Sequence, residues 1–325
     1  KGAHAAALSE KVNLIDFKKS RTLAALPEMV RYLKKSRPRV MISALDYANV
    51  VNLVARKLAG VSTKLIITEH NTLSVASQGD FRGMGRILPW LMKFTYPWAD
   101  QILAVSQGVA DDLANKLNLK RSKIAVAYNP VVTEQLSMLS AQEVQWPWPR
   151  VEGTSFILAT GRLAAAKDFS TLLKAFSILR KKRPAKLLIL GEGEERGMLE
   201  QKIAQYELGE DVALPGFVSN PYAWMASADL FVMSSRWEGL PTVLIEAMAC
   251  GAPVVSTDCP SGPAEILENG KWGRLVAVGD GAALAEAMDA SILDADRHPG
   301  LARAQDFSVK KSVLKYMQFI KILSS

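Results

Sequence analysis

The stretch of residues 229–257, DLFVMSSRWEGLPTVLIEAMACGAPVVST, determines the fold class that the sequence predicts. Its two ends, Asp229–Met233 and Pro253–Thr257, are short and mostly apolar, as buried strands are, and the segment between them predicts a helix over Thr242–Ala249. A strand, a helix and a second strand in this order form a unit whose strands run parallel and whose helix covers the sheet. The stretch therefore predicts an α/β fold.

The same alternation extends over the rest of the chain. After residue 150 it predicts strands and helices at Ser155–Thr160, Phe169–Lys181, Lys186–Leu190, Glu195–Tyr206, Val212–Leu214 and Pro221–Ala226. In the first half it predicts them at Arg39–Leu45, Asn49–Leu58, Lys64–Thr68, Gln101–Val105, Gln107–Leu117 and Lys123–Tyr128. Repeated alternation of this kind is typical of doubly wound parallel sheets.

A proline-punctuated segment, Gln145–Arg150, separates the two halves. We therefore expect two Rossmann-like domains with these bounds: residues 1–150, joined by a C-terminal helix within 308–325, and residues 151–307. Doubly wound domains usually open with a strand and a glycine-containing turn, but only Val12–Phe17 predicts a strand before Arg39. The first domain is therefore expected to lack its N-terminal part, of about 50 residues or more.

Composition limits the class of protein. A chain of 325 residues is long enough for about two domains, and 49% hydrophobic with 22% charged residues is typical of a soluble globular protein. No apolar run in the sequence reaches the roughly 18 to 20 residues that a membrane-spanning helix needs. The two cysteines, Cys250 and Cys259, are too few for a disulfide framework and indicate a reducing compartment.

The net charge of +8 lies on the first half of the chain. Residues 1–150 hold 21 Lys and Arg against 11 Asp and Glu, so the remainder is slightly acidic. A basic half indicates an anionic partner, such as a membrane surface or a phosphorylated acceptor, although a merely soluble basic surface has the same composition. Nucleic acid is not expected as a partner, because the basic residues are scattered and form no recognised module.

Two glutamates lie around the turn from the strand Asp229–Met233 to the following helix. Ligands of open α/β sheets bind beyond the carboxyl ends of the strands, and a helix N-terminus there offers free N–H groups to a diphosphate. Glu246, about one turn into the helix, could accept hydrogen bonds from a ribose diol, and Glu238, on the loop, from hydroxyls of a second ring. The alternative is that both are solvated or capping residues, since acidic groups favour helix starts.

The loop after the strand Ser155–Thr160 lies at the same predicted edge and carries two cations. Arg162 has a planar guanidinium that suits phosphate oxygens, and Lys167 a mobile point charge, so together they would stabilise a leaving diphosphate. A surface arginine and a lysine beside a helix are the plainer interpretation. Three further positions follow strands at this edge, Gly191, Gly193 and Phe217; glycines permit close approach of a ligand, and the backbone near Phe217 could contact a nucleobase edge.

Other site classes are not supported by the sequence. No Gly-x-Gly-x-x-Gly follows a strand, and the Walker lysine pattern is absent. No Asp-x-Asp pair and no clustered set of His, Cys and carboxylate ligands predicts a metal site. We therefore expect no metal and no cofactor other than the donor substrate itself.

Taken in order and with their spacing, several segments resemble the retaining glycosyltransferases of family 4, which have the two-domain GT-B fold. The resemblance covers nearly the whole chain and is carried by Gly161–Leu163 with Lys167–Asp168, Gly191–Gly193, Leu214–Phe217, Glu238–Pro241 with Glu246, Gly251–Val255 and Cys259–Pro263. It implies two Rossmann-like domains that face a cleft. The missing first strand and glycine-rich loop depart from the family pattern.

The resemblance also implies roles for these residues. Arg162 and Lys167 would hold the donor diphosphate, Glu238 the transferred sugar and Glu246 the ribose hydroxyls. The backbone of Gly239, Leu240 and Pro241 would bind the sugar and phosphate. Catalysis would need no metal and no protein nucleophile, because the departing phosphate assists attack from the front face.

In the first domain, the resemblance draws attention to His70, which follows the strand Lys64–Thr68. Many family members carry a histidine here that points into the cleft near the transferred sugar, although a lone histidine is more often structural. Ser106 has a similar position after Gln101–Val105. Residues 81–98 mix aromatics with Arg and Lys, as amphipathic segments on a membrane surface do, and equally as a core-facing helix with its charges outward does.

We therefore expect an enzyme that moves a hexose or N-acetylhexosamine, with retention, from a nucleoside-diphosphate sugar to a glycan or polyprenyl-linked glycan in polysaccharide or lipopolysaccharide synthesis. The segment Cys259–Pro263 is similar to that of members that use uridine-linked amino sugars, which favours UDP. Its expected place is the cytoplasm, at the inner face of the membrane if residues 81–98 touch lipid. The alternatives are a GT-B phosphorylase or epimerase and a non-catalytic protein that binds nucleotide sugars or glycans.

Overall fold

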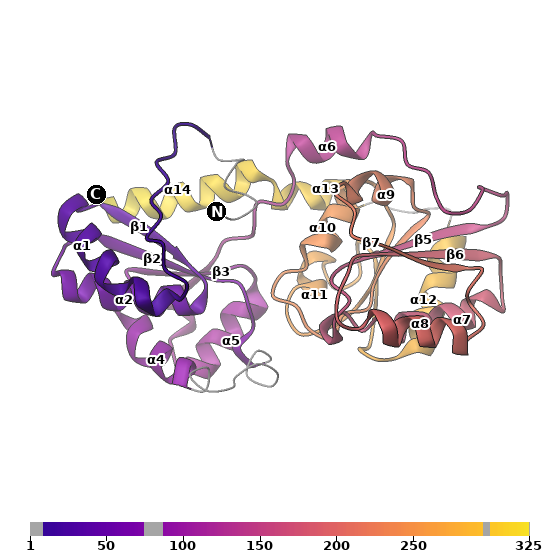
Figure 1. Cartoon of the computed structure of the whole chain (residues 1–325), viewed down its shortest axis with the longest axis horizontal. Helices are drawn as coiled ribbons and strands as arrows, with labels where there is room; N and C mark the ends of the chain where they lie inside the picture. The colour runs from indigo at the N-terminus through magenta and orange to yellow at the C-terminus, as the bar shows by residue number, and fades with distance from the viewer. Residues whose placement is uncertain (1–8, 75–86, 295–299, 325) are drawn as a thin grey trace.

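The computed structural model describes residues 9–74, 87–294 and 300–324. Two α/β units lie side by side, and the last helix spans from one to the other (Figure 1). We call the unit built on strands β1–β4 the first domain and the unit built on strands β5–β10 the second domain. The expected fold class, two Rossmann-like domains with parallel sheets, is confirmed.

The first domain contains a four-stranded parallel sheet in the order β1-β2-β3-β4. Its strands are β1 Val40–Ala44, β2 Lys64–Glu69, β3 Gln101–Ala104 and β4 Ile124–Val126. Helices α2, α4 and α5 cover one face of this sheet, and α14 packs against Ile66, Leu103 and Ala127 on the other. The helices are α1 Leu26–Ser36, α2 Asp46–Ala59, α4 Leu88–Thr95, α5 Gln107–Leu117 and α14 Val309–Ser324.

The second domain contains a six-stranded parallel sheet in the order β10-β9-β8-β5-β6-β7. Its strands are β5 Ser155–Thr160, β6 Ala185–Leu190, β7 Val212–Gly216, β8 Leu230–Met233, β9 Val254–Thr257 and β10 Arg274–Val276. Its helices are α7 Phe169–Arg180, α8 Arg196–Gln205, α9 Pro221–Ser227, α10 Thr242–Ala249, α11 Pro263–Ile266, α12 Gly281–Leu293 and α13 Leu301–Ala304. Chain order reverses between β5 and β8, which are hydrogen-bonded neighbours, so the switch point lies at their carboxyl ends.

The predicted strand at Val12–Phe17 is wrong. A strand needs a neighbour to take its backbone hydrogen bonds, and this segment pairs with none of the described strands; instead the Val12 N–H donates to Ser9 O in a local turn at 2.9 Å. Val12, Leu14 and Ile15 are about half exposed. Its apolar pattern was therefore no guide to burial.

The chain passes between the domains twice, and the two crossings are hydrogen-bonded to each other. Val131 N and Val132 N donate to Phe307 O at 2.9 and 3.1 Å, and Val309 N donates to Val132 O at 3.1 Å. The linker then continues through α6, Glu134–Ser140, which packs on α9, to Trp146. Trp146 is buried against Phe156 and Trp224 of the second domain, so the proline-rich joint is attached to that domain.

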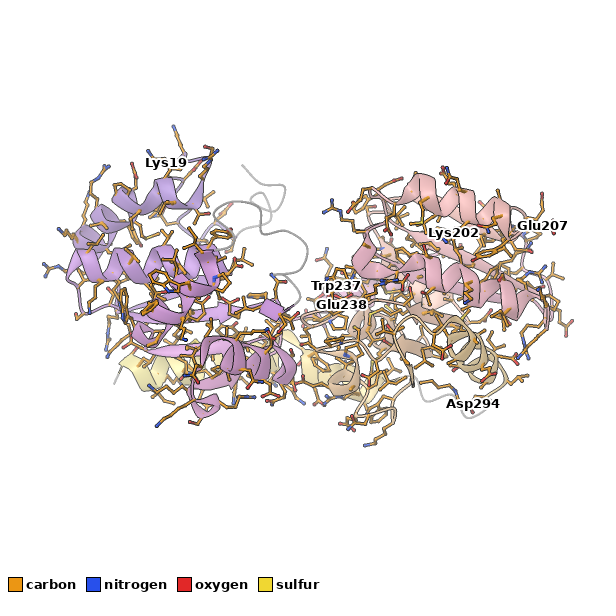
Figure 2. All side chains as sticks on the ribbon, turned by 90° about the horizontal axis from the view of Figure 1, so that it is seen from below. Lys19, Lys202, Glu207, Trp237, Glu238 and Asp294 are labelled. Atoms are coloured by element: carbon orange, nitrogen blue, oxygen red, sulfur yellow. The ribbon has the colours of Figure 1, made fainter. Side chains whose placement is uncertain are left out.

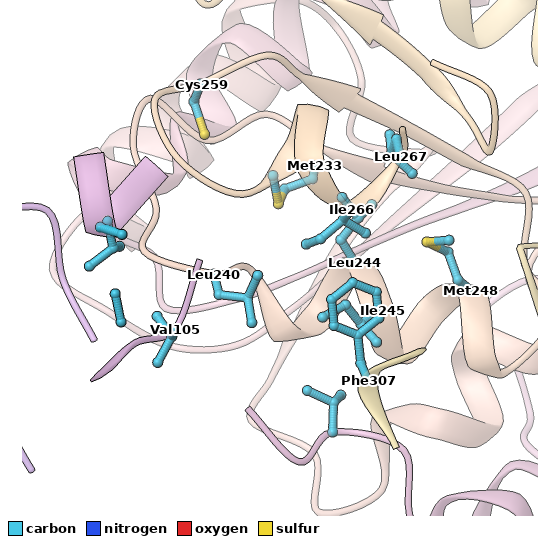
Figure 3. Close-up of a cluster of buried hydrophobic side chains, with 14 of the residues drawn as sticks. Val105, Met233, Leu240, Leu244, Ile245, Met248, Cys259, Ile266, Leu267 and Phe307 are labelled. Atoms are coloured by element: carbon cyan, nitrogen blue, oxygen red, sulfur yellow. The ribbon is translucent and has the colours of Figure 1, made fainter. Parts of the chain in front are cut away.

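We call the two hydrogen-bonded crossings, residues 128–132 and 307–309, the hinge. One apolar core runs from the first domain through the hinge into the second. Phe307 belongs to this core and is fully buried, and the Tyr128 ring lies 4.8 Å from its ring between centroids. Figure 3 shows Phe307 beneath Leu244 and Ile245 of α10, and Val105 of the first domain near Leu240 of the second. Because apolar contacts continue between the domains, their relative position depends on packing as well as on the chain connection.

A buried acid ends strand β2. Glu69 is 2% exposed, Asn49 Nδ2 donates to its Oε1 at 2.7 Å, and the Tyr96 hydroxyl donates to the same oxygen. Burial raises the pKa of Glu69 from 4.5 to about 7, although both donors lower it. This network fixes the carboxyl end of β2 and hence the position of His70.

Phe307→Ala should lower the free energy of unfolding by about 3–5 kcal/mol, because it leaves a cavity where the two crossings meet the core. Leu58→Ala is the matched control: Leu58 lies on α2 and is 60% exposed, so its loss should change stability by less than about 0.5 kcal/mol. Urea unfolding of the three proteins measures the difference. Equal stabilities would contradict the assignment of Phe307 to the shared core.

Glu69→Gln should flatten the dependence of stability on pH. An acid whose pKa is raised on folding stabilises the protein fully below its unfolded value, 4.5, and loses that contribution as pH rises through its folded value, about 7. The difference between these values corresponds to about 3 kcal/mol. The wild type should therefore lose about 3 kcal/mol more than the variant between about pH 4.5 and about pH 8. Parallel curves in denaturant titrations at several pH values would refute a buried, protonated Glu69.

Candidate functional site

The loops that follow β5 and β8 meet at the switch point of the second sheet. Lys167, on the first loop, places Nζ 2.5 Å from Glu238 Oε1 on the second, and Ser235 Oγ donates to the same oxygen at 2.7 Å. Both charged side chains are mostly shielded, at 21% and 14% exposure. Figure 2 places Trp237 and Glu238 on the side of the second domain that faces the first. Two of the predicted site residues are thus brought together.

The Lys167 loop is held by Asp168, which the sequence analysis quoted as part of the family pattern but gave no role. Asp168 is 4% exposed and has a φ of 45°, a left-handed conformation that aspartate tolerates better than most residues. Its carboxylate accepts from Thr171 N at the start of α7 and from Arg236 Nε at 2.9 Å. Ser234 Oγ donates to Lys167 O at 2.8 Å. These bonds tie the two loops together and limit where Lys167 Nζ can lie.

A pocket of about 380 Å³ opens at the start of the Lys167 loop, where Thr160 and Gly161 line it. Its lining includes four of the predicted residues, Arg162, Gly191, Phe217 and Glu246. The Phe217 side chain is 80% exposed at the rim. Arg162 is also largely exposed and pairs with Glu194 at 3.1 Å, so in this structure its guanidinium is held by a weak surface ion pair.

Glu246 is a partly buried acid that faces open space. No hydrogen bond or ion pair of its carboxylate is found among the residues that the structure describes, and burial raises its pKa from 4.5 to about 7. It also lines a second pocket of about 560 Å³ with Tyr222, Thr242 and residues of the hinge and α6. A desolvated acid that faces open pockets is typical of a ligand-binding position.

The glycines of the β6 loop are required by loop packing, and their predicted close approach to a ligand stays a prediction. A Cβ on Gly191 would lie 1.9 Å from Gly161 O, and a Cβ on Gly193 would lie 2.3 Å from Leu163 O. Glycine is therefore needed there because two loops of the second domain pack backbone to backbone. This packing shapes the wall of the pocket, and Gly191 itself lines it.

The loop Gly239–Pro241 lies against the first domain. A Cβ on Gly239 would lie 2.0 Å from His70 O, and Leu240 and Pro241 are buried. The Gly239 carbonyl accepts hydrogen bonds from Ser106 Oγ at 2.9 Å and Ser261 Oγ at 2.8 Å. Ser106 is fully buried and also caps α5, so its hydroxyl links α5 of the first domain to the Gly239 loop of the second. We call this contact between the two domains the seam.

His70 is placed at this seam. Its Nε2 lies 3.1 Å from Thr68 Oγ1, and burial lowers the pKa of the imidazole from its usual value of 6.5. The ring is therefore mostly neutral at pH 7. His70 contacts Gly239 through its backbone carbonyl. Predicted residues of the first and second domains are therefore neighbours at the contact between the domains.

Two searches over the described ranges gave negative results. Within residues 9–74, 87–294 and 300–324, no helix has the length and apolar character needed to cross a membrane. Within those same ranges, no three His, Cys, Asp or Glu side chains lie close enough together to hold a metal ion.

Comparison with known proteins identifies the family. Residues 140–305 match the family described as glycosyl transferases group 1, and residues 3–135 match glycosyltransferase family 4. The chain is 32% identical over 282 residues to the N-acetylgalactosamine-N,N'-diacetylbacillosaminyl-diphospho-undecaprenol 4-alpha-N-acetylgalactosaminyltransferase of Campylobacter jejuni, covering 84% of this chain and 74% of that protein. It is 31% identical over 263 residues to the amylovoran biosynthesis glycosyltransferase AmsD of Erwinia amylovora, covering 81% and 71%.

Solved structures show the same fold. The lipopolysaccharide outer core galactosyltransferase WaaB matches with a TM-score of 0.72 and 21% identity, over 94% of this chain and 81% of that one. HepE of Anabaena, solved with UDP and glucose, matches with a TM-score of 0.73 and 20% identity, over 92% and 81%. Since the matches extend over both domains, the chain belongs to the group 1, family 4 glycosyltransferases and is a glycosyltransferase of the GT-B fold.

Proposed function

We propose that this glycosyltransferase moves a hexose or N-acetylhexosamine, with retention of configuration, from a UDP-linked donor to a glycan carried on a polyprenyl diphosphate. The names of two relatives support the acceptor. The Campylobacter jejuni transferase described above is named for an undecaprenol-diphosphate-linked glycan, and so is a second protein of that organism, an alpha-1,4-N-acetyl-D-galactosaminyltransferase that is 28% identical over 296 residues. Crystal structures of HepE with UDP and with UDP-glucose support the donor.

The observation that carries the proposal is the arrangement at the switch point. A pocket lined by Arg162, Phe217 and Glu246 opens on the loop that also carries Lys167, which pairs with Glu238. A donor consists of a nucleoside, a diphosphate and a sugar in sequence. We place the nucleoside at Phe217 and Glu246, and the diphosphate at Arg162 and Lys167. The sugar then lies at Glu238. Glu246 then accepts hydrogen bonds from the ribose hydroxyls, and the diphosphate lies near the two cations.

The chemistry follows from these charges. As the bond between sugar and phosphate breaks, negative charge grows on the leaving diphosphate, and Lys167 with Arg162 offsets it. Lys167 then interacts with the diphosphate as well as with Glu238. The Glu238 carboxylate can therefore accept hydrogen bonds from hydroxyls of the sugar. We propose that the acceptor hydroxyl attacks on the face that the diphosphate leaves and gives its proton to a phosphate oxygen. His70, largely neutral, lies across the seam and contacts the transferred sugar. No metal has a role in this scheme.

Lys167→Ala and Glu246→Ala should each lower kcat/KM for transfer by about 100-fold or more, because each removes a polar group that holds the donor or its developing charge. Lys202→Ala on α8 and Glu286→Ala on α12 are matched controls away from the pocket and should leave the rate within about twofold. Release of UDP from a UDP-sugar, with and without chelator, is the measurement.

Wild-type rates in both site variants would contradict the assignment of the site. A rate that depends on inorganic phosphate would identify a phosphorylase, and binding of the donor without turnover would identify a non-catalytic protein. Loss of transfer in chelator that is restored by a divalent cation would refute metal independence.

An apolar face of the first domain supports a membrane-bound acceptor. The predicted segment 81–98 is only partly covered, since residues 81–86 lie outside the described residues. In α4, Leu88 and Met92 are buried, as a core-facing helix requires, but Trp90 and Phe94 are 59% and 53% exposed and their rings are 4.5 Å apart. We propose that this aromatic pair, with Lys93 beside it, rests on the membrane surface where the polyprenyl chain is anchored.

The double variant Trp90→Ser, Phe94→Ser should bind vesicles that contain anionic phospholipid about tenfold more weakly, because it removes two side chains that would enter the interface. Transfer to a water-soluble acceptor should be unchanged. Leu293→Ser, a change to a similarly exposed apolar side chain on α12, is the control and should bind as the wild type does. Equal binding of all three proteins in a sedimentation assay would contradict membrane contact through α4.

A further inference from the structure

One carboxylate of the second domain accepts three hydrogen bonds from the first. Glu265 lies in α11; its Oε1 and Oε2 accept from Gln107 N at 3.0 and 2.8 Å, and Oε1 also accepts from the Tyr128 hydroxyl at 2.7 Å. Gln107 is the first residue of α5, and Tyr128 lies at the first chain crossing. The two partners thus belong to different parts of the first domain.

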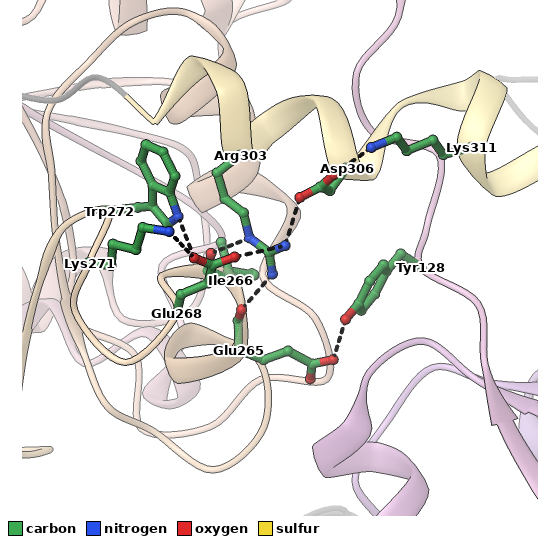
Figure 4. Close-up of polar contacts among 9 residues, drawn as sticks. All are labelled: Tyr128, Glu265, Ile266, Glu268, Lys271, Trp272, Arg303, Asp306 and Lys311. Carbon is green, nitrogen blue, oxygen red and sulfur yellow. Dashed lines mark hydrogen bonds and ion pairs between the residues drawn. The ribbon is translucent and has the colours of Figure 1, made fainter.

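The carboxylate is carried on a fixed support. Arg303 Nη2 donates to Glu265 O at 2.7 Å and Arg303 Nε donates to Ile266 O at 3.0 Å. The turn that leads into α11 is bent by Ser261, with φ of 70°, and Gly262, with φ of 108°. Figure 4 shows α11 held between Arg303 and the hinge, with the Glu265 side chain directed to Tyr128. Glu265 therefore cannot follow the first domain if that domain rotates away.

The charges and donors on the first domain match the carboxylate. The N-terminus of α5 carries the positive end of the helix dipole, so an anion there is stabilised. Burial and Glu265 raise the pKa of the Tyr128 phenol well above its usual value of 10.0, so the hydroxyl keeps its proton and donates. Its ring packs on Phe307, and its carbonyl accepts from Ser312 of α14 at 2.8 Å.

These bonds continue into the loop of the candidate site. Ser106, next to Gln107, donates to Gly239 O, and its hydroxyl lies 2.8 Å from Ser261 Oγ. A Cβ on Gly108 would lie 2.8 Å from Ser261, so α5 and the turn before α11 are in close contact. The contacts therefore connect Tyr128 to Glu265, and Glu265 to Gln107 at the start of α5. Ser106, the preceding residue, bonds to Gly239 O, and Gly239 lies against His70 O.

We infer that Glu265 is a positioning residue that fixes the angle between the two domains and so holds His70 against the Gly239 loop. It touches neither pocket, and its effect passes through Gln107, Tyr128 and the serine pair. The inference rests on the proposed function for its kinetic consequence only. With Glu265 in place, the first domain is aligned over the donor loop; without it, the N-terminus of α5 separates from α11 and the seam opens.

Hydrogen exchange of the Gln107 amide tests the contact directly. In Glu265→Ala this amide should exchange about tenfold faster or more, because it loses a charge-assisted bond. Glu265→Gln keeps one carbonyl acceptor without the charge and should lie between the two. Glu200→Gln is the matched control: Glu200 is on α8 and its carboxylate pairs with Arg196 of the same helix at 3.0 Å, so exchange at Gln107 should be unchanged. Thermal unfolding checks that each variant is folded.

Transfer kinetics test the consequence. Glu265→Ala should lower kcat by about tenfold or more with a smaller change in the KM of the donor, because the donor pocket lies within the second domain. Glu265→Gln should keep part of the wild-type rate, and Glu200→Gln should keep all of it. Unchanged exchange at Gln107 in Glu265→Ala, or faster exchange with an unchanged kcat, would overturn the inference. The exchange measurement uses neither donor nor acceptor, so failure of the proposed function leaves it intact.

Discussion

The pairing of β5 with β8 is the constraint on which the site depends. These two strands are neighbours in the sheet but are separated in the chain by two further strands, so the loops after them are brought together from distant parts of the sequence. Lys167 follows the first strand and Glu238 the second, and only this pairing places Nζ and Oε1 at 2.5 Å. The helices that follow both loops begin at the same edge, so backbone N–H groups and side-chain cations face one region.

Much of the fold could be predicted from periodicity and turn residues. Helices Gln107–Leu117 and Thr242–Ala249 were predicted at their observed ends, because a capping serine precedes the first and Gly-Pro residues precede the second. The helices α6 and α12 and the short strand β10 were not predicted. The prediction relied on strands and helices that alternate along the chain, and these segments show no clear pattern of that kind. The failed prediction at Val12–Phe17 has a simple cause: apolar residues indicate a strand only if a neighbouring strand exists to pair with it.

The residue types of the candidate site could be selected from the sequence, and most of their interactions could not. Lys167, Glu238, Arg162 and Glu246 could be selected because each follows a strand at one edge of the sheet. The ion pair of Arg162 with Glu194 and the support of Lys167 by Asp168 and Arg236 could not, because they depend on loop conformations such as the left-handed φ of Asp168. Gly191 and Gly193 were selected because their small size permits close approach. The structure shows that backbone atoms of the neighbouring loop, Gly161 O and Leu163 O, already require glycine there. Contacts between the domains, such as those of Glu265, have no local sequence signal.

The carboxyl group of Glu246 has one more consequence. Burial raises its pKa to about 7, so this carboxyl group is partly protonated at neutral pH. Hydroxyl donors from a bound ribose favour the ionised form, so occupation of the pocket would expel a fraction of a proton into the medium. Nucleotide binding would then tighten as the solution becomes more alkaline through neutrality, and the heat of binding would vary with the ionisation enthalpy of the buffer.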